Sequence, residues 1–479
     1  MSGPHSTIAE APLQRARGAA APVLPRLLAG VHTEGALTLA DHLSVHGQLP
    51  PLRGGRRRRG REHAAALIDE IERSGLLGHG GAAFPTATKM RAVASGRGRA
   101  IVVANGAEGE PASLKDRTLL EMAPHLVLDG AVLAAEAVDA DEVIVCACET
   151  ADASVHSLEQ AIEERAVEPR AGRSPKLHLR TVPGHYVAGQ ESALVNYLGG
   201  GPAMPTFTPP LPFEQGLRRR PTLVDNVETL AHVALIARHG APWFRQLGTP
   251  SQPGSALVTL SGPVADPGVY EIEHGASLAS LIDAAGGTTT GVRGALLGGY
   301  AGAWVSREWL GGVALSKEHL AAHGATLGAG VVLLLSDQAC PVAETARVAR
   351  WMAGQSVRQC GPCLNGLDSL AGTLEQLAFN GAEASVTRRI ERLASLTARR
   401  GACGHPDGAV NLILSALEAF HGDFAEHARH GACDRCARPP ELPLPDREVS
   451  DQASRDRVSG RGSSRGGASR DRATRGGAT

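Results

Sequence analysis

The stretch Gly75-Leu-Leu-Gly-His-Gly-Gly-Ala-Ala-Phe-Pro-Thr86 places four glycines and one aromatic residue in a twelve-residue turn. It follows a helical pattern, HAAALIDEIERS (63–74), and precedes the β-rich run RAIVVAN (99–105). Glycines in such a loop often serve turn geometry alone, because they accept a positive φ without a Cβ clash. Unhindered N–H groups followed by the ammonium of Lys89 can also hold a phosphate. The loop matches neither the Walker pattern nor the dinucleotide fingerprint that follows a strand, so its meaning depends on the surrounding chain.

Outward from this loop, residues 62–250 alternate helical and β-rich runs, which predicts an α/β domain with a Rossmann-like sheet and crossover helices. Residues 251–337 contain a hairpin pattern, a capped helix and further strands, which together predict a small β-grasp module of the soluble ligand-binding kind. Four segments with helical spacing in 338–436 predict a four-helix bundle carrying a cysteine site. Residues 1–61 are expected to form an irregular arm, and 437–479 a disordered tail poor in large apolar residues.

The overall composition excludes several classes of partner. The chain has 479 residues, a formal net charge of −1 and only 3% aromatic residues, so neither a basic surface nor base stacking supports nucleic-acid binding. The first residues lack a charged region followed by an apolar one, and no run of about 18 apolar residues occurs. We therefore expect a soluble, cytoplasmic protein of several domains that does not insert directly into a membrane.

Three further loops of the α/β region carry polar groups. The strand ending at Asn105 is followed by Glu108 and Glu110, and ligands of open α/β sheets bind at such strand ends. Taken alone, the same sequence also suits an ordinary turn whose acidic side chains are solvated. The loop PGHYVAGQES (183–192) adds Tyr186, Gly189 and Glu191, and TLVDNVET (222–229) adds Asn226 and Glu228. Four such loops in one domain favour a common binding site.

Five motifs in order carry a resemblance to a known family: SGLLGHGGAAFPTATK (74–89), NGAEGEPASLKDR (105–117), GHYVAGQESAL (184–194), RPTLVDNVETL (220–230) and CGPC (360–363). Over roughly residues 62–430, the chain resembles the flavoprotein, NADH-binding subunit of respiratory complex I and the related subunits of NAD-reducing hydrogenases and formate dehydrogenases. The resemblance implies an NADH dehydrogenase-type oxidoreductase that takes hydride from NAD(P)H onto FMN. It also implies single-electron transfer through an iron–sulfur cluster to a ferredoxin-like, quinone-reducing or complex I-like partner. Such a protein would be cytoplasmic and could be peripheral to a membrane through its partners.

The resemblance also implies roles for individual residues. The FMN ligands would come from the glycine loop and two strand ends, and the nicotinamide nucleotide would lie against an aromatic residue and several acids. Hydride transfer would belong to FMN, so no side chain is a catalytic residue. The expected cofactor-binding residues are Gly78, Gly80, Gly81, Phe84, Lys89, Asn105, Glu108, Glu110, Tyr186, Gly189, Glu191 and Asn226.

The sequence departs from the family pattern at four of these loop positions. His79 stands where the family has arginine, and Ala83 where it has glycine. Ala107 replaces an aspartate, and Gln190 replaces one of two adjacent glutamates. An unpaired donor in a dry site costs about 1–3 kcal/mol, so these changes affect the affinity for the nucleotide or the choice between NADH and NADPH.

The cysteines predict a metal site. By the resemblance, Cys360, Cys363 and Cys403 are three ligands of a 4Fe-4S cluster, whereas Val357 occupies the position of the first family cysteine. A fourth ligand could come from His405, a water or a tail cysteine. Cys433 and Cys436 form a second C-x-x-C pair, so both pairs could instead hold one zinc ion, or no metal could be present.

Two other functions remain open from the sequence. The altered residues Ala107, Gln190 and Val357 would suit a non-catalytic scaffold of the same fold that no longer binds FMN. A thiol-based redox sensor using Cys360 and Cys363 would need exposed thiols of low pKa. Cys146 and Cys148 lie in an apolar strand pattern and are expected to be buried.

Overall fold

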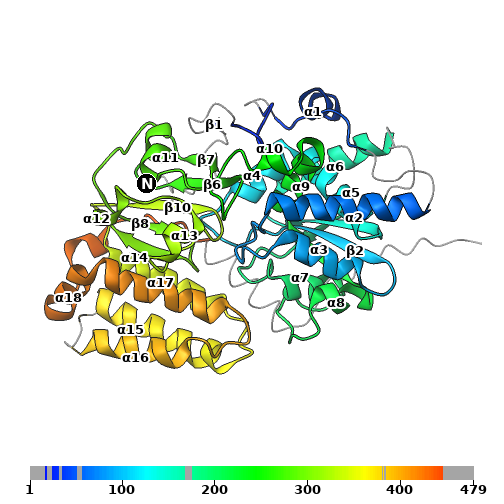
Figure 1. Cartoon of the computed structure of the whole chain (residues 1–479). Helices are drawn as coiled ribbons and strands as arrows, with labels where there is room; N and C mark the ends of the chain where they lie inside the picture. Colours follow the sequence, from blue (N-terminus) through cyan, green and yellow to red (C-terminus); the bar gives the residue numbers. More distant parts are fainter. Residues whose placement is uncertain are drawn as a thin grey trace, which may run out of the picture. The chain divides into compact units, whose positions relative to one another are not determined.

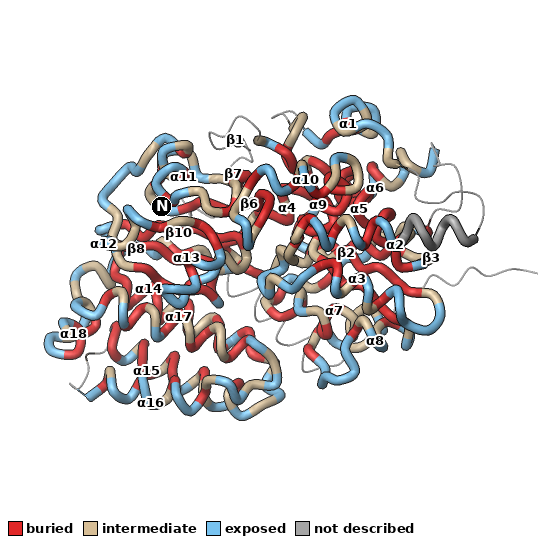
Figure 2. The backbone as a smooth tube through the Cα atoms, in the orientation of Figure 1, coloured by how far each residue is buried: buried red, intermediate tan, exposed pale blue. Residues whose placement is uncertain are grey.

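A computed structural model describes residues 17–18, 24–31, 35–50, 57–167, 175–379, 381 and 385–445. Its described part contains a parallel sheet with flanking helices, a second sheet and a helical bundle (Figure 1). In Figure 2 the strands of both sheets and the helices between them are mostly buried, whereas the connecting turns are exposed.

The first sheet consists of β2 (Ala100–Gly106), β3 (Ala140–Cys148), β4 (Lys176–Val182) and β5 (Thr222–Asn226). The strand order is β4-β3-β2-β5, and every pairing is parallel. The apolar run of β2 is buried because helices cover both faces of such a sheet. Asn105 on β2 is in register with Asn226 on β5, so two predicted site residues lie side by side at the carboxyl edge. This confirms the predicted parallel α/β domain.

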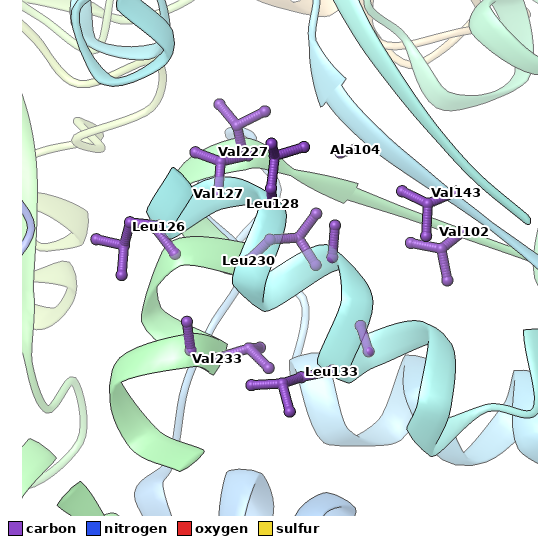
Figure 3. Close-up of a cluster of buried hydrophobic side chains, with 14 of the residues drawn as sticks. Val102, Ala104, Leu126, Val127, Leu128, Leu133, Val143, Val227, Leu230 and Val233 are labelled. Atoms are coloured by element: carbon purple, nitrogen blue, oxygen red, sulfur yellow. The ribbon is translucent and has the colours of Figure 1, made fainter. Parts of the chain in front are cut away.

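The helices of this domain are α2 (Arg57–Ser74), α3 (Thr86–Ala94), α4 (Lys115–Met122), α5 (Pro124–Ala137), α6 (Asp152–Val167), α7 (Glu191–Leu198), α8 (Pro212–Gln215), α9 (Val227–His239) and α10 (Ala241–Phe244). Buried aliphatic side chains of α5 and α9 pack together against β2 and β3 (Figure 3). Gly130 is required at this crossing, because a Cβ there would lie 1.7 Å from the carbonyl oxygen of Leu230. This close packing makes α5 part of the domain core.

No helix among the described residues has both the length and the apolar composition to cross a membrane alone. Helices α4 and α5 pass that test only as a pair, and they are bent by 96° relative to each other. Nearly all residues of α5 are buried within the domain, which accounts for their apolar character.

The second sheet contains β6 (Ser255–Ser261), β7 (Gly268–Glu273), β8 (Val292–Leu297), β9 (Ala303–Ser306) and β10 (Val331–Ser336). The predicted hairpin is present, because β6 and β7 pair antiparallel. The predicted capped helix is α11 (Leu278–Ala284), in which the hydroxyl of Ser277 accepts the N–H of Ser280. The short helices α12 (Arg307–Leu310) and α13 (Lys317–Ala321) complete this region.

The helical bundle contains α14 (Pro341–Gly354), α15 (Leu367–Phe379), α16 (Val386–Thr397), α17 (His405–Ala419) and α18 (His421–His430). The fourth predicted segment is divided into α17 and α18, because the backbone of Phe420 leaves the helical conformation. The bundle core, which includes Leu370, Leu374 and Ile413, continues into one face of the second sheet through Leu333 and Leu335.

The two ends of the chain differ from the expectation. Within the stretch expected to be irregular, α1 (Leu39–His46) begins with a capping box between Thr38 and Asp41, and the short β1 (Arg17–Gly18) pairs parallel with β7. At the other end, Leu442 is only 3% exposed, so the packed chain extends past the predicted start of the tail at 437. Residues 446–479 of that tail lie outside the described residues.

Candidate functional site

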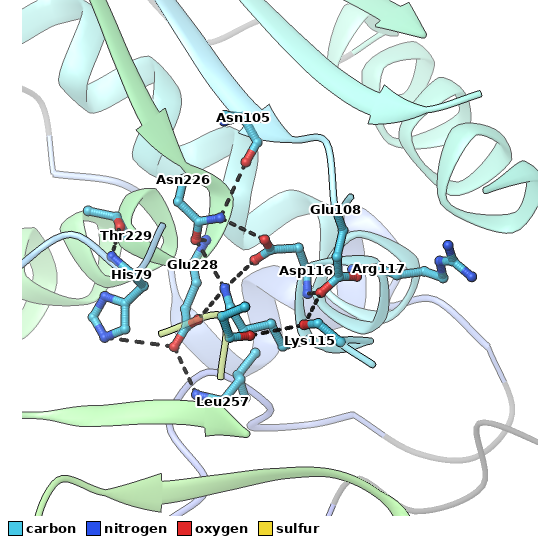
Figure 4. Close-up of polar contacts among 12 residues, drawn as sticks. His79, Asn105, Glu108, Lys115, Asp116, Arg117, Asn226, Glu228, Thr229 and Leu257 are labelled. Atoms are coloured by element: carbon cyan, nitrogen blue, oxygen red, sulfur yellow. Dashed lines mark hydrogen bonds and ion pairs between the residues drawn. The ribbon is translucent and has the colours of Figure 1, made fainter. Parts of the chain in front are cut away.

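The carboxyl edge of the first sheet brings the predicted asparagines together (Figure 4). The Asn226 side chain caps α9 by accepting the N–H of Glu228 at 3.0 Å, and its amide donates to Asp116 at 2.7 Å. The Asn105 amide donates to the carbonyl of Gly189 at 2.8 Å. These bonds fix the two strand ends and attach the loop of residues 183–192 to them.

The glycine loop lies above this edge. The N–H of Gly78 donates to the carbonyl of Phe84 at 2.8 Å, which closes the loop, and the N–H of His79 donates to the Thr229 hydroxyl at 2.9 Å. A Cβ on Gly80 would approach only the side chain of Asn226, at 3.5 Å, and one on Gly81 would have nothing within 4 Å. The described residues therefore leave open space beside Gly80 and Gly81.

Two further features of this loop concern its conformation and exposure. Phe84 is 44% exposed, although it is a large aromatic residue. Ala83 has a φ of 48°, in the left-handed region that favours glycine, and this is the position where the related proteins were expected to carry glycine. The loop backbone at Ala83 thus has a conformation that suits glycine better than alanine.

Lys89 connects three of the predicted loops. Its ammonium donates to the carbonyl of Val224 at 2.8 Å and lies 3.5 Å from a carboxylate oxygen of Asp225 and 3.7 Å from one of Glu191. Burial opposes the charge on Lys89, but the two carboxylates outweigh it and raise the pKa of Lys89. One buried oxygen of Asp225 and one of Glu191 have no hydrogen-bond partner within the described chain. Both oxygens are shielded from solvent, so each is a buried acceptor that the described chain leaves unsatisfied.

The two acids of the predicted acidic loop have different surroundings. Glu108 accepts the N–H groups of Asp116 and Arg117, both at 3.1 Å, and thereby caps the start of α4. Glu110 accepts the N–H of Tyr300 at 2.8 Å, which joins this loop to the turn between β8 and β9. Burial raises the pKa of Glu110 to about 7. Both carboxylates already hold the protein together, and their contact with a nucleotide stays a prediction.

Tyr186 and Gly189 bring the loop of residues 183–192 against two other parts of the protein. A Cβ on Gly189 would lie 2.5 Å from the carbonyl oxygen of Ala107, so glycine is required for this approach. The Tyr186 hydroxyl shares a hydrogen bond with Glu110, and its ring contacts Trp351 edge-on at 5.4 Å. Gln190, which replaces the expected glutamate, caps α7 by accepting the N–H of Ala193 at 2.9 Å. Its side chain therefore points into the helix start.

A buried charge cluster beside Asn226 was missed by the sequence analysis. The Lys115 ammonium lies 2.7 Å from Asp116 and 2.9 Å from Glu228, and all three side chains are almost fully buried. Burial opposes the charge on Lys115, but the two carboxylates raise its pKa. Burial, followed by the charge of Lys115, lowers the pKa of His79 to about 3, so His79 is neutral where the family arginine would be charged. In the sequence, Lys115 and Asp116 look like ordinary exposed charges at the start of a helix, so nothing local indicates that they are buried.

The three predicted cluster ligands lie near one another at one end of the bundle. Cys360 lies just before the π-helical turn Pro362–Gly366 that leads into α15, Cys363 lies within that turn, and Cys403 precedes α17. Burial, with neighbouring Cys360 and Cys403, raises the pKa of Cys363 to about 11. Cys363 is also buried, so it does not fit the exposed thiol of low pKa that a redox sensor would require.

The alternatives for the fourth ligand are partly resolved. The His405 ring bonds through Nε2 to the carbonyl of Met352 at 2.8 Å, and it faces Tyr186. Cys433 and Cys436 lie instead beside Cys340 and His427. No group of clustered metal-binding side chains among the described residues joins the two C-x-x-C pairs, so one zinc site made from both pairs is wrong for this structure, whereas the fourth ligand of the cluster stays a prediction.

A parallel α/β sheet with an open glycine loop at its carboxyl edge, joined to a bundle with clustered thiols, defines the class of flavin- or nucleotide-binding redox subunits. Residues 71–235 match the Nuo51 FMN-binding domain, and 343–427 match the NADH-ubiquinone oxidoreductase-F iron-sulfur binding region. Residues 257–298 match the SLBB domain.

Similar proteins agree with these matches. An F-type subunit of the NADH-quinone oxidoreductase of Rhizobium meliloti (strain 1021) is 32% identical over 378 residues, 77% of this chain and 90% of that protein. The NADP-reducing hydrogenase subunit HndC of Solidesulfovibrio fructosivorans is 28% identical over 380 residues, 77% of each chain. A crystal structure of NAD+-reducing NiFe-hydrogenase in the H2-reduced state superposes with a TM-score of 0.72 and 31% identity, covering 85% of this chain and 68% of that one. The chain therefore belongs to the family of F-type subunits of NADH-quinone oxidoreductase.

Proposed function

We propose that this protein is an NADH dehydrogenase-type flavoprotein that binds FMN at the glycine loop and passes electrons to a partner through the cysteine site of its bundle. The single observation that carries the proposal is the open space beside Gly80 and Gly81, directly above the end of β5. Family membership supports the same assignment.

The residues at the sheet edge fit FMN. Gly80 and Gly81 are exposed and have no side chains, and the His79 side chain is turned inward, so a planar ring system can lie on this backbone. Asn105 and Asn226 would position the ligand at the two strand ends, and Lys89 would supply positive charge near it. FMN, when bound, supplies the acceptor for hydride from the nicotinamide, and the protein's part is to hold the two rings together and exclude water.

The nucleotide would lie on the outer side of the same loop. Phe84 is exposed there and can stack on a ring, and the Glu191 side chain, which is 32% exposed, can accept hydroxyl or amide donors. Glu110 and Tyr186 would act as a pair, since their side chains share a hydrogen bond. The side chains at two of the altered positions point inward. That of His79 points toward Glu228, and that of Gln190 points into the start of α7.

The thiols of Cys360, Cys363 and Cys403 fit a cluster with three thiolate ligands, in which Val357 occupies the position of the first family cysteine. Tyr186 lies between the nucleotide-binding loops and this site, because its ring contacts His405 at 5.6 Å and His405 is two residues from Cys403. Packed side chains thus connect the two sites. We propose complex I-like or ferredoxin-like subunits as electron acceptors in the cytoplasm, since the relatives named above are subunits of such enzymes.

The proposal is tested by purifying the full chain without oxygen, recording its visible spectrum and adding NADH. Flavin bands that bleach with NADH are expected. Gly80→Leu should abolish FMN binding, because its side chain would fill the open space. Gly422→Leu is a matched control on α18, where a Cβ also meets nothing within 4 Å, and it should bind FMN normally.

Two results would contradict the proposal. A folded protein that takes up no FMN from excess would support the scaffold alternative suggested by Ala107, Gln190 and Val357. Equal FMN affinity for Gly80→Leu and Gly422→Leu would show that the flavin, if bound, lies elsewhere.

A further inference from the structure

A second group of side chains that could hold a metal ion lies where α14 begins and α18 ends. It consists of Cys340 at the start of α14, His427 on α18, and Cys433 and Cys436 on the turn that follows. One ligand atom from each residue lies within 4.8 Å of all the others. Three of these residues fall outside 343–427, the segment that matches the iron-sulfur binding region.

The distances fit one small ion. The Sγ atoms of Cys340 and Cys436 are 3.4 Å apart, and those of Cys433 and Cys436 are 3.7 Å apart. The Nε2 atom of His427 lies 3.4 Å from Cys340 Sγ and 3.3 Å from Cys436 Sγ. A tetrahedron with zinc–sulfur bonds of about 2.3 Å has edges of about 3.8 Å, so the four atoms stand close to its corners. A four-iron cluster would require a much wider separation of its thiolates.

The histidine is oriented for metal binding. Its Nδ1 lies 2.8 Å from the carbonyl oxygen of Asp423, so the proton sits on Nδ1, and the lone pair of Nε2 points to the sulfurs. The carboxylate of Asp423 is itself held by Arg293 at 2.6 Å and by Arg435 at 2.9 Å. The α18 backbone that presents the histidine is therefore fixed to β8 and to the cysteine turn.

We propose that Cys340, His427, Cys433 and Cys436 bind one structural zinc ion, separate from the iron–sulfur site. Three thiolates and one imidazole form a complete tetrahedral set of the kind found in structural zinc sites, with no position left open for a substrate. A disulfide within the Cys433–Cys436 pair would leave Cys340 and His427, which approach the same sulfur equally closely, without a function.

The zinc ion would fasten the end of the described chain to the rest of the protein. Just after Cys436, Glu441 accepts the N–H of Ser336 at 3.0 Å, and the N–H of Leu442 donates to Glu344 at 3.2 Å. The hydroxyl of Tyr300 donates to the carbonyl of Pro443, and the N–H of Tyr300 donates to Glu110. The zinc ion therefore stabilises the segment that ends at Pro443. Pro443 contacts Tyr300, and the N–H of Tyr300 holds Glu110 of the acidic loop in place.

The test measures zinc and iron in the full-length protein, purified anaerobically from medium containing both metals. About one zinc per chain is expected, and it should resist dialysis against a chelator, as a closed Cys3His site does. Cys436→Ser should lose the zinc but keep its iron and FMN. His427→Cys should keep the zinc, because four thiolates are an equally good set. Cys360→Ser should lose iron and keep zinc.

Hydrogen exchange provides a readout of the segment itself. In Cys436→Ser, the amides of Arg438, Glu441, Leu442 and Leu444 should exchange faster than in the wild type, whereas in Cys360→Ser they should not. The proposal is overturned if folded wild-type protein carries iron but no zinc, if Cys360→Ser loses both metals, or if Cys436→Ser loses iron. Because zinc is measured without reference to flavin or NADH, this outcome is independent of the proposed dehydrogenase function.

Discussion

Replacing Lys115 by methionine tests whether the buried charge cluster at the carboxyl edge of the first sheet holds the α/β domain together. Lys115 is 3% exposed and pairs with Asp116 at 2.7 Å and Glu228 at 2.9 Å. Methionine has a similar length but no charge, so the substitution leaves two buried carboxylates without a cation. Removing one partner of a buried ion pair costs about 3–5 kcal/mol, and we expect a loss in this range at pH 8.

The loss should depend on pH in a defined direction. Burial raises the pKa of Asp116, and Lys115 is the main influence that lowers it, so the substitution raises this pKa further. The folded variant then holds a proton that its unfolded chain releases, and its stability falls as the pH rises through the folded pKa. One extra proton corresponds to about 1.4 kcal/mol per pH unit, so the difference from wild type should shrink by up to about 2.7 kcal/mol from pH 7 to pH 5.

Urea denaturation at pH 5, 7 and 8, followed by circular dichroism, measures this difference through the shift in midpoint. Lys317→Met is the matched control, because Lys317 is exposed at the start of α13, and it should change stability by less than about 0.5 kcal/mol. Lys115→Met/Glu228→Gln should recover part of the loss. A Lys115→Met variant as stable as the control, or one whose deficit is the same at pH 5 and pH 8, would refute the role given to this cluster.

Three further substitutions test other parts of the site. Burial raises the pKa of Glu110 to about 7, so ionisation of Glu110 opposes folding. Glu110→Gln should therefore gain stability relative to wild type as the pH rises from about 4.5 to about 7. The difference in melting temperature between the two proteins at pH 5 and pH 8 measures this gain. Equal differences at both pH values would contradict it. Ala83→Gly should raise the unfolding free energy by about 1 kcal/mol, since alanine has a φ of 48° there; a destabilised variant in urea denaturation would show that the alanine methyl group is needed. Cys403→Ser should lower the iron content, whereas Cys146→Ser on β3 should not; elemental analysis that finds unchanged iron in Cys403→Ser removes this residue from the ligand set.

Much of the fold could be predicted from the sequence because its signals are local. The apolar run of β2 and the capped pattern of α11 each indicate their own conformation within a few residues. The break at Phe420 was missed because apolar spacing continues across it, and helix α1 was missed because its eight residues carry a weak apolar pattern. The site at the sheet edge could also be predicted in outline, since parallel strands bring Asn105 and Asn226 to the same edge.

What escaped prediction depends on pairings between distant residues. Lys115 has the sequence pattern of an ordinary exposed charge at a helix start, and only its contact with Glu228, 113 positions away in the chain, makes it a buried cation. Cys340 lacks any local metal motif, and it meets Cys436 only because α14 begins where the turn after α18 ends. The sequence pattern paired Cys433 and Cys436 with the wrong partners for the same reason. In both cases the role of the residue depends on contacts between elements that are distant in the sequence. Its neighbours in space and their charges determine that role, and its neighbours in the sequence do not.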